Sequence, residues 1–414
     1  MKTSETRKLY PALSHFYDGK RLIYFDNACS VLKARPVIEA VNEYNNLYGS
    51  CAGNRSVHYL SLKVNQRCDE SRETVRRFIN ARYPEEIIWT KNATESLNLI
   101  ASAFRFHRDK KDVIASNFEH HSNLLPFYLL QKKGLIRLKI FELEKDGSFN
   151  LDKFSKFLTK KVALVSMMHV SNVTGGQLPI KEIAKLAHNF GALISIDDAQ
   201  YLATHRQDVM ANEIDFLSFS SHKIGGPTGL GVLYIRREVQ DLLDNFQLGG
   251  GTVQRVKIKK GCLAVELLPA PFRFEAGIQN YSAIFGIKAA VDLINQIGYV
   301  AIGRQTALLT EQLRTALAAI SGVKILGGET SNNNSLVSFY FTRRRASLED
   351  FNIFLNNELK NCLIAVRCGH HCAQPLHDFL GTSPISLRAS FFVYNTPKEV
   401  ELFIEALQSY LKKI

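Results

Sequence analysis

The pattern that most constrains this chain is a regular alternation of short apolar runs with longer helical patterns between residues 85 and 235. Short runs rich in β-branched residues indicate strands, and strands separated by helix-length segments indicate βαβ units with a mainly parallel sheet. We therefore predict an α/β fold for this region. The clearest strand candidates are EEIIWT (85–90), KVALVSMMHV (161–170), ALISID (192–197), DFLSFSSHK (215–223) and GLGVLYI (229–235).

Two of the intervening segments are predicted to be helical. Residues 93–104 (ATESLNLIASAF) follow the first strand candidate directly. In 179–191 (PIKEIAKLAHNFG), Pro179 suits a first helical turn and Gly191 suits the C-cap. Apolar residues recur there at helical spacing, which predicts one buried face. That face consists of Ile180, Ile183, Ala184 and Ala187.

The second part of the chain has a different pattern. Residues 249–277 are glycine-rich at their start and basic in the middle, which favours a hairpin or an extended excursion. Beyond residue 282, long helical patterns precede further elements in an α+β order. These are a strand at 332–341, a helix at 346–360, a strand at 385–394 and a C-terminal helix beginning near Pro397.

The length also favours more than one domain. A chain of 414 residues is too long for one ordinary hydrophobic core. We predict an N-terminal segment (1–20) that packs on the small domain, a large α/β domain over 21–285, and a small α+β domain over 286–414. No internal repeat or low-complexity segment suggests another division.

Composition excludes several classes of protein. Hydrophobic residues make up 46% of the chain and charged residues 22%, which is typical of soluble globular proteins rather than disordered ones. No apolar run reaches the roughly 18 residues of a membrane span, and the first residues lack the apolar segment of a secretory signal. Seven irregularly spaced cysteines do not describe a disulfide framework. We expect a cytoplasmic protein without a membrane partner.

The positive charge of the chain is spread rather than clustered. The formal net charge is +13, but the longest basic run is only Arg343 to Arg345. Clustered Lys and Arg are the electrostatic footprint of nucleic-acid binding. Scattered pairs instead favour a solvated basic surface, so a nucleic-acid partner is not expected.

Three groups of polar residues lie at the ends of predicted elements, where open α/β sheets place their ligands. A helix start offers free N–H groups and a positive dipole end to a phosphate. Together the groups fit pyridoxal phosphate, which requires a lysine amine, a carboxylate for its ring nitrogen and a phosphate cup. The groups are Asp197; Ser220, His222 and Lys223; and Asn92, Thr94 and Glu95.

A series of motifs over roughly residues 22–404 resembles the class V aminotransferase family of fold type I enzymes, and within it the SufS/CsdA type of cysteine desulfurase. The resemblance implies a mainly parallel seven-stranded sheet in the large domain and a catalytic cysteine loop in the small one. It also implies a homodimer and a sulfur acceptor of the SufE or SufU kind. The motifs are YFDNA, GNRSVHYLS, NATESLN, EHHSNLLP, HVSNVTG, IDDAQ, SFSSHKIGGPTGLGVLY, RFEAG, VRCGHHCAQP and RASFFVYNT.

The resemblance also implies a role for individual residues. Lys223 would bind the cofactor covalently, Asp197 would partner the ring nitrogen, and His120 would stack on the ring and move protons. Cys372 would be the nucleophile that takes sulfur from L-cysteine, leaving a persulfide and releasing alanine. The phosphate cup would comprise Ala93, Thr94, Ser220 and His222; Gln200 and Asn172 would contact the ring oxygen or the substrate; Arg388, assisted by Arg367, would bind the substrate carboxylate.

The stretch RCGHHCAQP (367–375) has other interpretations. Two cysteines and two histidines are zinc ligands, but adjacent histidines between the thiols seldom converge on one tetrahedral ion, and no metal site is expected. A redox pair of Cys368 and Cys372 is a second alternative. A third hypothesis is that His370, His371 and Arg367 favour the reactive thiolate of Cys372 electrostatically.

Several positions depart from the family pattern. Ile278 replaces a threonine that reaches the phosphate of the partner subunit, and Asn54 replaces a common histidine. Ala93, Cys29 and Cys368 also stand where other residues are usual. A selenocysteine lyase, another class V enzyme such as a transaminase or epimerase, and a basic binding protein on a decayed scaffold remain alternatives, although a transaminase has no need of the thiol.

Overall fold

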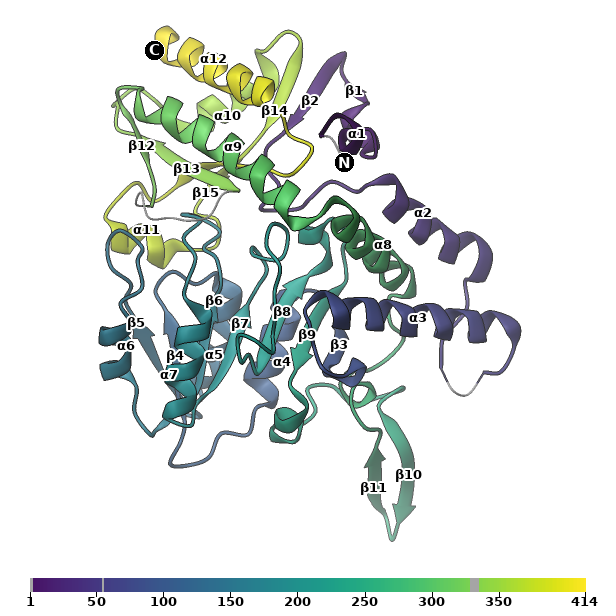
Figure 1. Cartoon of the computed structure of the whole chain (residues 1–414). Coiled ribbons are helices and arrows are strands. Elements are labelled where there is room, and N and C mark those ends of the chain that lie inside the picture. The colour runs from purple at the N-terminus through teal and green to yellow at the C-terminus, as the bar shows by residue number, and fades with distance from the viewer. Residues whose placement is uncertain (1–2, 54–55, 328–334) are drawn as a thin grey trace.

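A seven-stranded sheet forms the centre of the larger part of the molecule (Figure 1). The computed structural model describes residues 3–53, 56–327 and 335–414. Within these residues the strand order is β3-β9-β8-β7-β6-β4-β5, and β9 runs antiparallel to both neighbours while the other pairs are parallel. The predicted mainly parallel sheet is therefore confirmed. The strands are β3 (Ile87–Thr90), β4 (Asp112–Ser116), β5 (Arg137–Phe141), β6 (Val162–Met168), β7 (Leu193–Asp197), β8 (Phe216–Ser220) and β9 (Gly231–Ile235).

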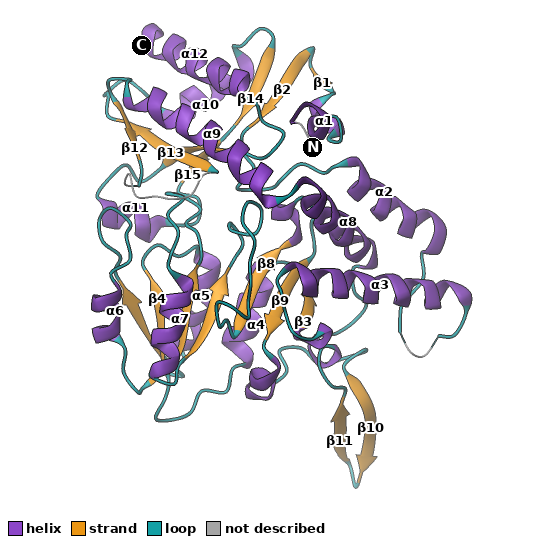
Figure 2. Ribbon diagram, in the orientation of Figure 1, coloured by secondary structure: helices purple, strands orange, loops and turns teal. Residues whose placement is uncertain are grey.

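Helices cover both faces of this sheet, which explains why its central strands are apolar on both sides (Figure 2). In β9, Leu233 packs with the helices of one face and Val232 with those of the other. One face is covered by α4 (Ala93–Ala103) and α5 (His121–Lys132), and the other by α3 (Tyr59–Phe78), α6 (Leu151–Phe157), α7 (Ile180–Asn189) and α8 (Tyr281–Ile297).

The predicted helix at 179–191 is present as α7. It begins at Ile180, so Pro179 is the N-cap rather than the first helical residue. Gly191 follows the helix with a φ of 71°, a left-handed conformation that glycine adopts without strain. The four residues of the predicted apolar face are all buried.

A second, smaller body contains most of the C-terminal part of the chain. Its main sheet has the order β12-β13-β16-β15. The predicted strand at 332–341 is observed over Leu336–Phe341, and residues 332–334 lie outside the described part. The elements are α9 (Tyr299–Ala318), β12 (Val323–Ile325), β13 (Leu336–Phe341), α10 (Leu348–Asn357), β14 (Cys362–Ala365), β15 (Arg367–Gly369), α11 (Gln374–Leu380), β16 (Ser386–Ser390) and α12 (Pro397–Lys413).

The predicted strand at 385–394 is too long. β16 ends at Ser390, and the following aromatic residues are buried side chains of a turn in which Asn395 Oδ1 accepts a hydrogen bond from the Phe392 amide at 2.9 Å. Phe391 belongs to the core of the small body, whereas Phe392 and Tyr394 belong to the core of the large one. The apolar run therefore joins two cores instead of extending a strand.

The strand β2 (Lys20–Tyr24) pairs with the small body, whereas Tyr10, earlier in the N-terminal segment, packs in the core of the large body. β2 pairs in parallel with β14, and the amide of Phe25 continues the pairing by donating to Ala365. These contacts hold residues 20–25 beside β14 of the small body. We therefore propose that the large domain begins after β2 and not at residue 21. The other N-terminal elements are α1 (Thr3–Arg7), β1 (Phe16–Tyr17) and α2 (Arg35–Glu43).

The segment 249–277 forms a hairpin that projects from the body (Figure 1). β10 (Val253–Lys259) and β11 (Cys262–Leu267) pair antiparallel, so the predicted hairpin is confirmed. Among the described residues, no single helix is long and apolar enough to cross a bilayer; α8 and α9 pass that test only as a pair, and they bend by 79° at the break between them.

Candidate active site

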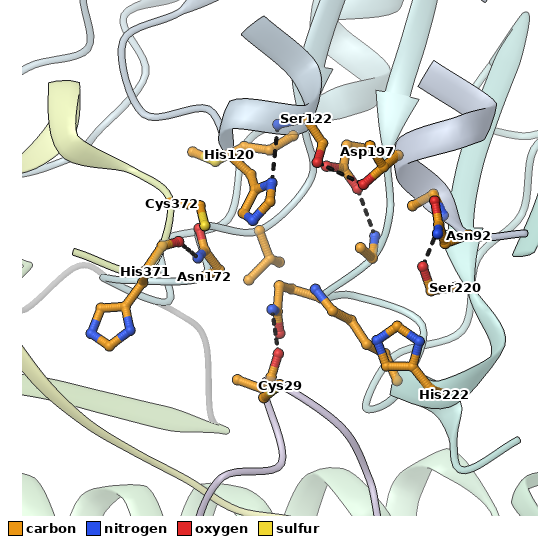
Figure 3. Close-up of a pocket in the computed structure, with 18 of the residues that line it drawn as sticks. Cys29, Asn92, His120, Ser122, Asn172, Asp197, Ser220, His222, His371 and Cys372 are labelled. Atoms are coloured by element: carbon orange, nitrogen blue, oxygen red, sulfur yellow. Dashed lines mark hydrogen bonds between the residues drawn. The ribbon is translucent and has the colours of Figure 1, made fainter. Parts of the chain in front are cut away.

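A pocket of about 310 Å³ lies at the carboxyl ends of β7 and β8, and residues of the small body contribute to its lining (Figure 3). Its lining comes from segments spread over almost the whole chain. The structure brings together every site residue predicted from the sequence. They are Ala93, Thr94, His120, Asn172, Asp197, Gln200, Ser220, His222, Lys223, Arg367, Cys372 and Arg388.

Lys223 is held by a single 3-10 turn (Ser221–Ile224) that directly follows β8. Gly225 ends this turn with a φ of 86°, which returns the chain sharply from the strand end. Burial lowers the pKa of Lys223, and the nearby carboxylate of Asp197 opposes this shift. Its amine has no hydrogen bond or ion pair within the described part of the chain. A desolvated amine of this kind is well suited to act as a nucleophile.

Asp197 is the last residue of β7 and is only 7% exposed. Its Oδ1 accepts a hydrogen bond from the amide of Ala199 at 3.1 Å. Burial raises the pKa of Asp197, while Lys223 lowers it. The sheet therefore presents a buried carboxylate to the pocket, where it can pair with a cationic group.

The start of α4 forms another part of the wall. Asn92 is the N-cap of α4, and its Oδ1 accepts from the amide of Glu95 at 2.9 Å. Ser220 Oγ accepts from the amide of Ala93 at 2.8 Å, which ties the helix to the end of β8. Such a helix start favours an anionic ligand.

Gly231 makes this arrangement possible by allowing β9 to approach the same helix start. A Cβ atom at this position would lie 2.5 Å from the backbone of Asn92, a distance that real contacts do not reach. Close backbone contact of this kind is a common reason for glycine within a strand.

His120 is the N-cap residue of α5. Its Nδ1 accepts a hydrogen bond from the amide of Ser122 at 3.1 Å. Burial, together with Lys223, lowers the pKa of His120 to about 3. The ring is therefore neutral at physiological pH, with its proton on Nε2.

Two arginines meet at Asp26, a residue within the YFDNA motif to which the sequence assigned no role. Arg367 Nη2 lies 2.8 Å from Asp26 Oδ2, and Arg388 Nη2 lies 3.4 Å from Oδ1. Arg388 also donates to the carbonyl of Asn172 at 2.8 Å. Its Nε, however, has no partner among the described residues, and the side chain is 3% exposed. The pocket thus offers a buried guanidinium donor to a ligand.

Cys372 lies in the turn between β15 and α11 and is exposed. Its amide donates to His370 Nδ1 at 3.0 Å, and its carbonyl accepts from the amide of His121 at 2.8 Å. His371 and Cys372 have φ values of 51° and 54°, in the left-handed region that is unfavourable for residues other than glycine. The turn is therefore held in place by neighbouring contacts rather than by its own backbone preference.

His371 does not support the hypothesis of a cationic cluster around the thiol. Its ring is buried, with Nε2 at 3.1 Å from Ser386, and burial together with Arg388 lowers its pKa to about 2. His371 is therefore neutral. Its carbonyl instead accepts from Asn172 Nδ2 at 2.7 Å, which fixes the turn against the large body. No group of three potential metal ligands is present among the described residues.

Some lining residues were not predicted from the sequence. Ser122 was missed although it lies in the EHHSN motif, and its hydroxyl lies 2.7 Å from that of Thr94. Cys29 was noted only as an unusual residue, but it lines the pocket. Ile278 lies outside this lining and is 75% exposed. Asn54 lies outside the described residues.

Comparisons with known proteins agree with this site. The family model for aminotransferase class-V matches residues 23–403. A probable cysteine desulfurase of Streptomyces coelicolor is 35% identical and the alignment covers 99% of this chain and 97% of the relative. The apo structure of a cysteine desulfurase from Thermococcus onnurineus NA1 superimposes with a TM-score of 0.91 at 34% identity, covering 100% and 99% of the two chains.

A second solved structure gives the same result. The cysteine desulfurase CsdA of Escherichia coli, in its S-sulfonic acid form, has a TM-score of 0.88 at 28% identity and covers 100% of this chain and 99% of its own. The family model spans both bodies and every pocket residue described above. The chain therefore belongs to the aminotransferase class-V family, with the fold of the type I enzymes that use pyridoxal phosphate.

Proposed function

We propose that this protein is a pyridoxal phosphate-dependent cysteine desulfurase that converts L-cysteine to L-alanine and retains the sulfur as a persulfide on Cys372. One observation carries the proposal. A desolvated lysine, a buried carboxylate and an exposed thiol line the same pocket, although the thiol comes from the other body of the molecule. The names of the full-length relatives support the same activity.

The residues present fit the cofactor at three points. The unpartnered amine of Lys223 would bind its aldehyde, and Asp197 would hold the proton on its ring nitrogen. The start of α4, with Thr94 and Ser220, would hold its phosphate. Bound pyridoxal phosphate supplies an electron sink for the bonds at the substrate α-carbon.

The substrate carboxylate would bind the guanidinium of Arg388. This side chain is buried, and its Nε lacks a partner in the described part of the chain. A carboxylate at this position gains charge-assisted hydrogen bonds that the unliganded pocket does not provide. Asn172, whose carbonyl already accepts from Arg388, would complete the contact. Arg367 lies beside it on the same Asp26 carboxylate.

Sulfur transfer is assigned to Cys372. Its thiolate attacks the sulfur of the substrate, an S–S bond forms, and the C–S bond of the substrate breaks. The electron pair of that bond returns to carbon, which takes up a proton to give alanine. His120 is suited to move protons here, because its Nδ1 is engaged by Ser122 and its Nε2 is free to exchange.

We also propose a homodimer and a separate protein that accepts the sulfur. Support for the dimer comes from the projecting hairpin, whose apolar side chains are exposed in the single chain. These exposed apolar side chains are Val256, Ile258, Leu263 and Val265. A second copy of the chain would cover this apolar surface.

The test measures alanine and sulfide after L-cysteine is added to protein loaded with pyridoxal phosphate. Wild type is expected to produce both in the presence of a reductant, and the Cys372→Ser variant is expected to lose nearly all sulfide. Cys368→Ser is the matched control, because Cys368 lies on β15 outside the pocket lining. Equal products from wild type and Cys372→Ser would refute the proposal.

A further inference from the structure

The active pocket contains a second thiol. Cys29 and Cys372 both line it, although they lie near opposite ends of the sequence. Burial is the main cause of the lowered pKa of Lys223, and the thiols of Cys29 and Cys372 each act to raise that pKa. Both thiols and the Lys223 amine therefore border the same pocket.

Cys29 lies in a turn that is held by hydrogen bonds of its backbone. Its amide donates to the carbonyl of Asp26 at 3.1 Å, and the carbonyl of the preceding Ala28 accepts from Gln200 Nε2 at 2.8 Å. The turn after β2 is thus fixed to both bodies, because Gln200 belongs to the large one and β2 pairs in the small one. Cys372, by contrast, lies in an exposed turn with left-handed backbone angles.

Arg367 places a donor directly on the second thiol. Its Nη2 donates to Cys29 Sγ at 2.8 Å while it also binds Asp26. Sulfur acts as the acceptor in this contact, an arrangement that accommodates a thiolate, which is the nucleophilic form of cysteine. The buried, unpartnered Nε of Arg388 offers a further donor to an anion in the same pocket.

We propose that Cys29 is a second sulfur-carrying residue, which receives the outer sulfur of the Cys372 persulfide. This inference rests on the proposed function. The Cys29 thiolate attacks the outer sulfur, a new S–S bond forms on Cys29, and the S–S bond on Cys372 breaks. Cys372 leaves as a thiolate, and the proton of the persulfide stays on the transferred sulfur. No electrons are gained or lost overall, so no oxidant or reductant is needed.

The consequence is storage of two sulfur atoms for each chain. Transfer returns Cys372 to the form that attacks a second substrate molecule, while the first sulfur stays beside Arg367. In the absence of acceptor and reductant, the early burst of alanine should therefore be about twice as large in wild type as in Cys29→Ser. Cys368→Ser should show the burst of wild type, because Cys368 does not line the pocket.

The experiment combines burst measurement with peptide mass spectrometry after rapid alkylation. In wild-type protein loaded with cofactor and mixed briefly with L-cysteine, an added sulfur is expected first on Cys372 and then on Cys29. A second arm treats the protein with limiting inorganic polysulfide instead of substrate. Cys29 should then gain sulfur in wild type and severalfold less in Cys372→Ser, because the sulfur arrives through Cys372.

The outcomes separate this inference from the proposed function. Sulfur on Cys372 but never on Cys29, or equal bursts in wild type and Cys29→Ser, would overturn the inference and leave the desulfurase intact. Equal polysulfide labelling of Cys29 in wild type and Cys372→Ser, or a Cys29–Cys372 disulfide in place of persulfides, would overturn it as well. No alanine from any protein would refute the proposed function, while the polysulfide arm would still test the transfer.

Discussion

The two walls of the pocket are built differently. Lys223, Asp197 and Ser220 sit at or just beyond the ends of central strands, and both faces of their sheet are covered by helices. Cys372 sits in an exposed turn of the small body, in a backbone conformation that its own residue type disfavours. One wall is fixed by the core of the fold, and the other by a few hydrogen bonds.

This difference fits the two tasks that we propose for the site. Binding and orienting a cofactor requires groups that stay in place, and a packed sheet supplies them without reorganisation. A nucleophile that must reach a substrate and then offer its sulfur to another molecule requires a segment that can move. The walls should therefore respond differently to substitution, which the following predictions address.

The largest effect is expected for Lys223→Ala. Without this amine the cofactor cannot be bound covalently, so borohydride reduction should leave no cofactor mass on the chain and activity should fall by orders of magnitude. Mass spectrometry after reduction measures this. Lys33→Met is the matched control, because burial lowers the pKa of Lys33 to about 8 but the residue lies outside the pocket lining. Labelling of Lys33 instead of Lys223 would contradict the assignment.

Gly231→Ala tests whether the cofactor wall is rigid. The added methyl group would overlap the backbone of Asn92, so β9 and the start of α4 must separate. We expect a loss of about 1–3 kcal/mol in the free energy of unfolding, together with weaker cofactor binding. Gly303→Ala in α9 is the control, because no atom lies within 4 Å of the added Cβ. Equal denaturation midpoints for the two variants would show that this wall can adjust.

His370→Ala tests the thiol wall alone. The substitution removes the acceptor of the Cys372 amide and the ring that stacks on His121. Persulfide formation should slow by no more than about tenfold, which corresponds to the free energy contributed by one hydrogen bond. The absorbance of the bound cofactor should stay unchanged. Stopped-flow measurement of alanine formation checks this. A change in cofactor affinity would mean that the two walls are not independent.

The smallest effect concerns pH and His371. The ordinary pKa of about 6.5 applies to the unfolded chain, and burial lowers the folded value to about 2. Between these values the unfolded chain binds more protons, so stability falls as the pH is lowered through that window. His371→Gln should lose less stability than wild type between about pH 7 and pH 5. Thermal unfolding at both values measures the difference, and parallel losses would refute it.

The sequence predicted residues of both walls, but on different grounds. The strands that carry Asp197 and Ser220 are short apolar runs, and residues at the ends of parallel strands meet at one edge of the sheet by geometry alone. The motifs supplied the positions of His120, Arg388 and Cys372, all of which line the pocket.

What the sequence did not predict depends on contacts between distant segments. Asp26 binds Arg367 and Arg388 only because β2 pairs with β14. No local sequence pattern reveals that two strands so far apart in the sequence pair in parallel. The neutral state of His371 likewise follows from burial against Ser386. The apolar run after Ser390 resembles a longer strand, but it fills two cores, a tertiary effect that overrides local preference.

The pairing of β2 with β14 also bears on how the protein is made. A ribosome synthesises β2 (Lys20–Tyr24) long before β14 (Cys362–Ala365), so β2 emerges well ahead of its parallel partner. The sheet that carries Asp197 and Lys223 is complete while the growing chain still lacks Cys372. Nascent molecules can therefore form this part of the proposed vitamin B6 site before they contain Cys372, and until β14 emerges the edge of β2 that faces it is unpaired.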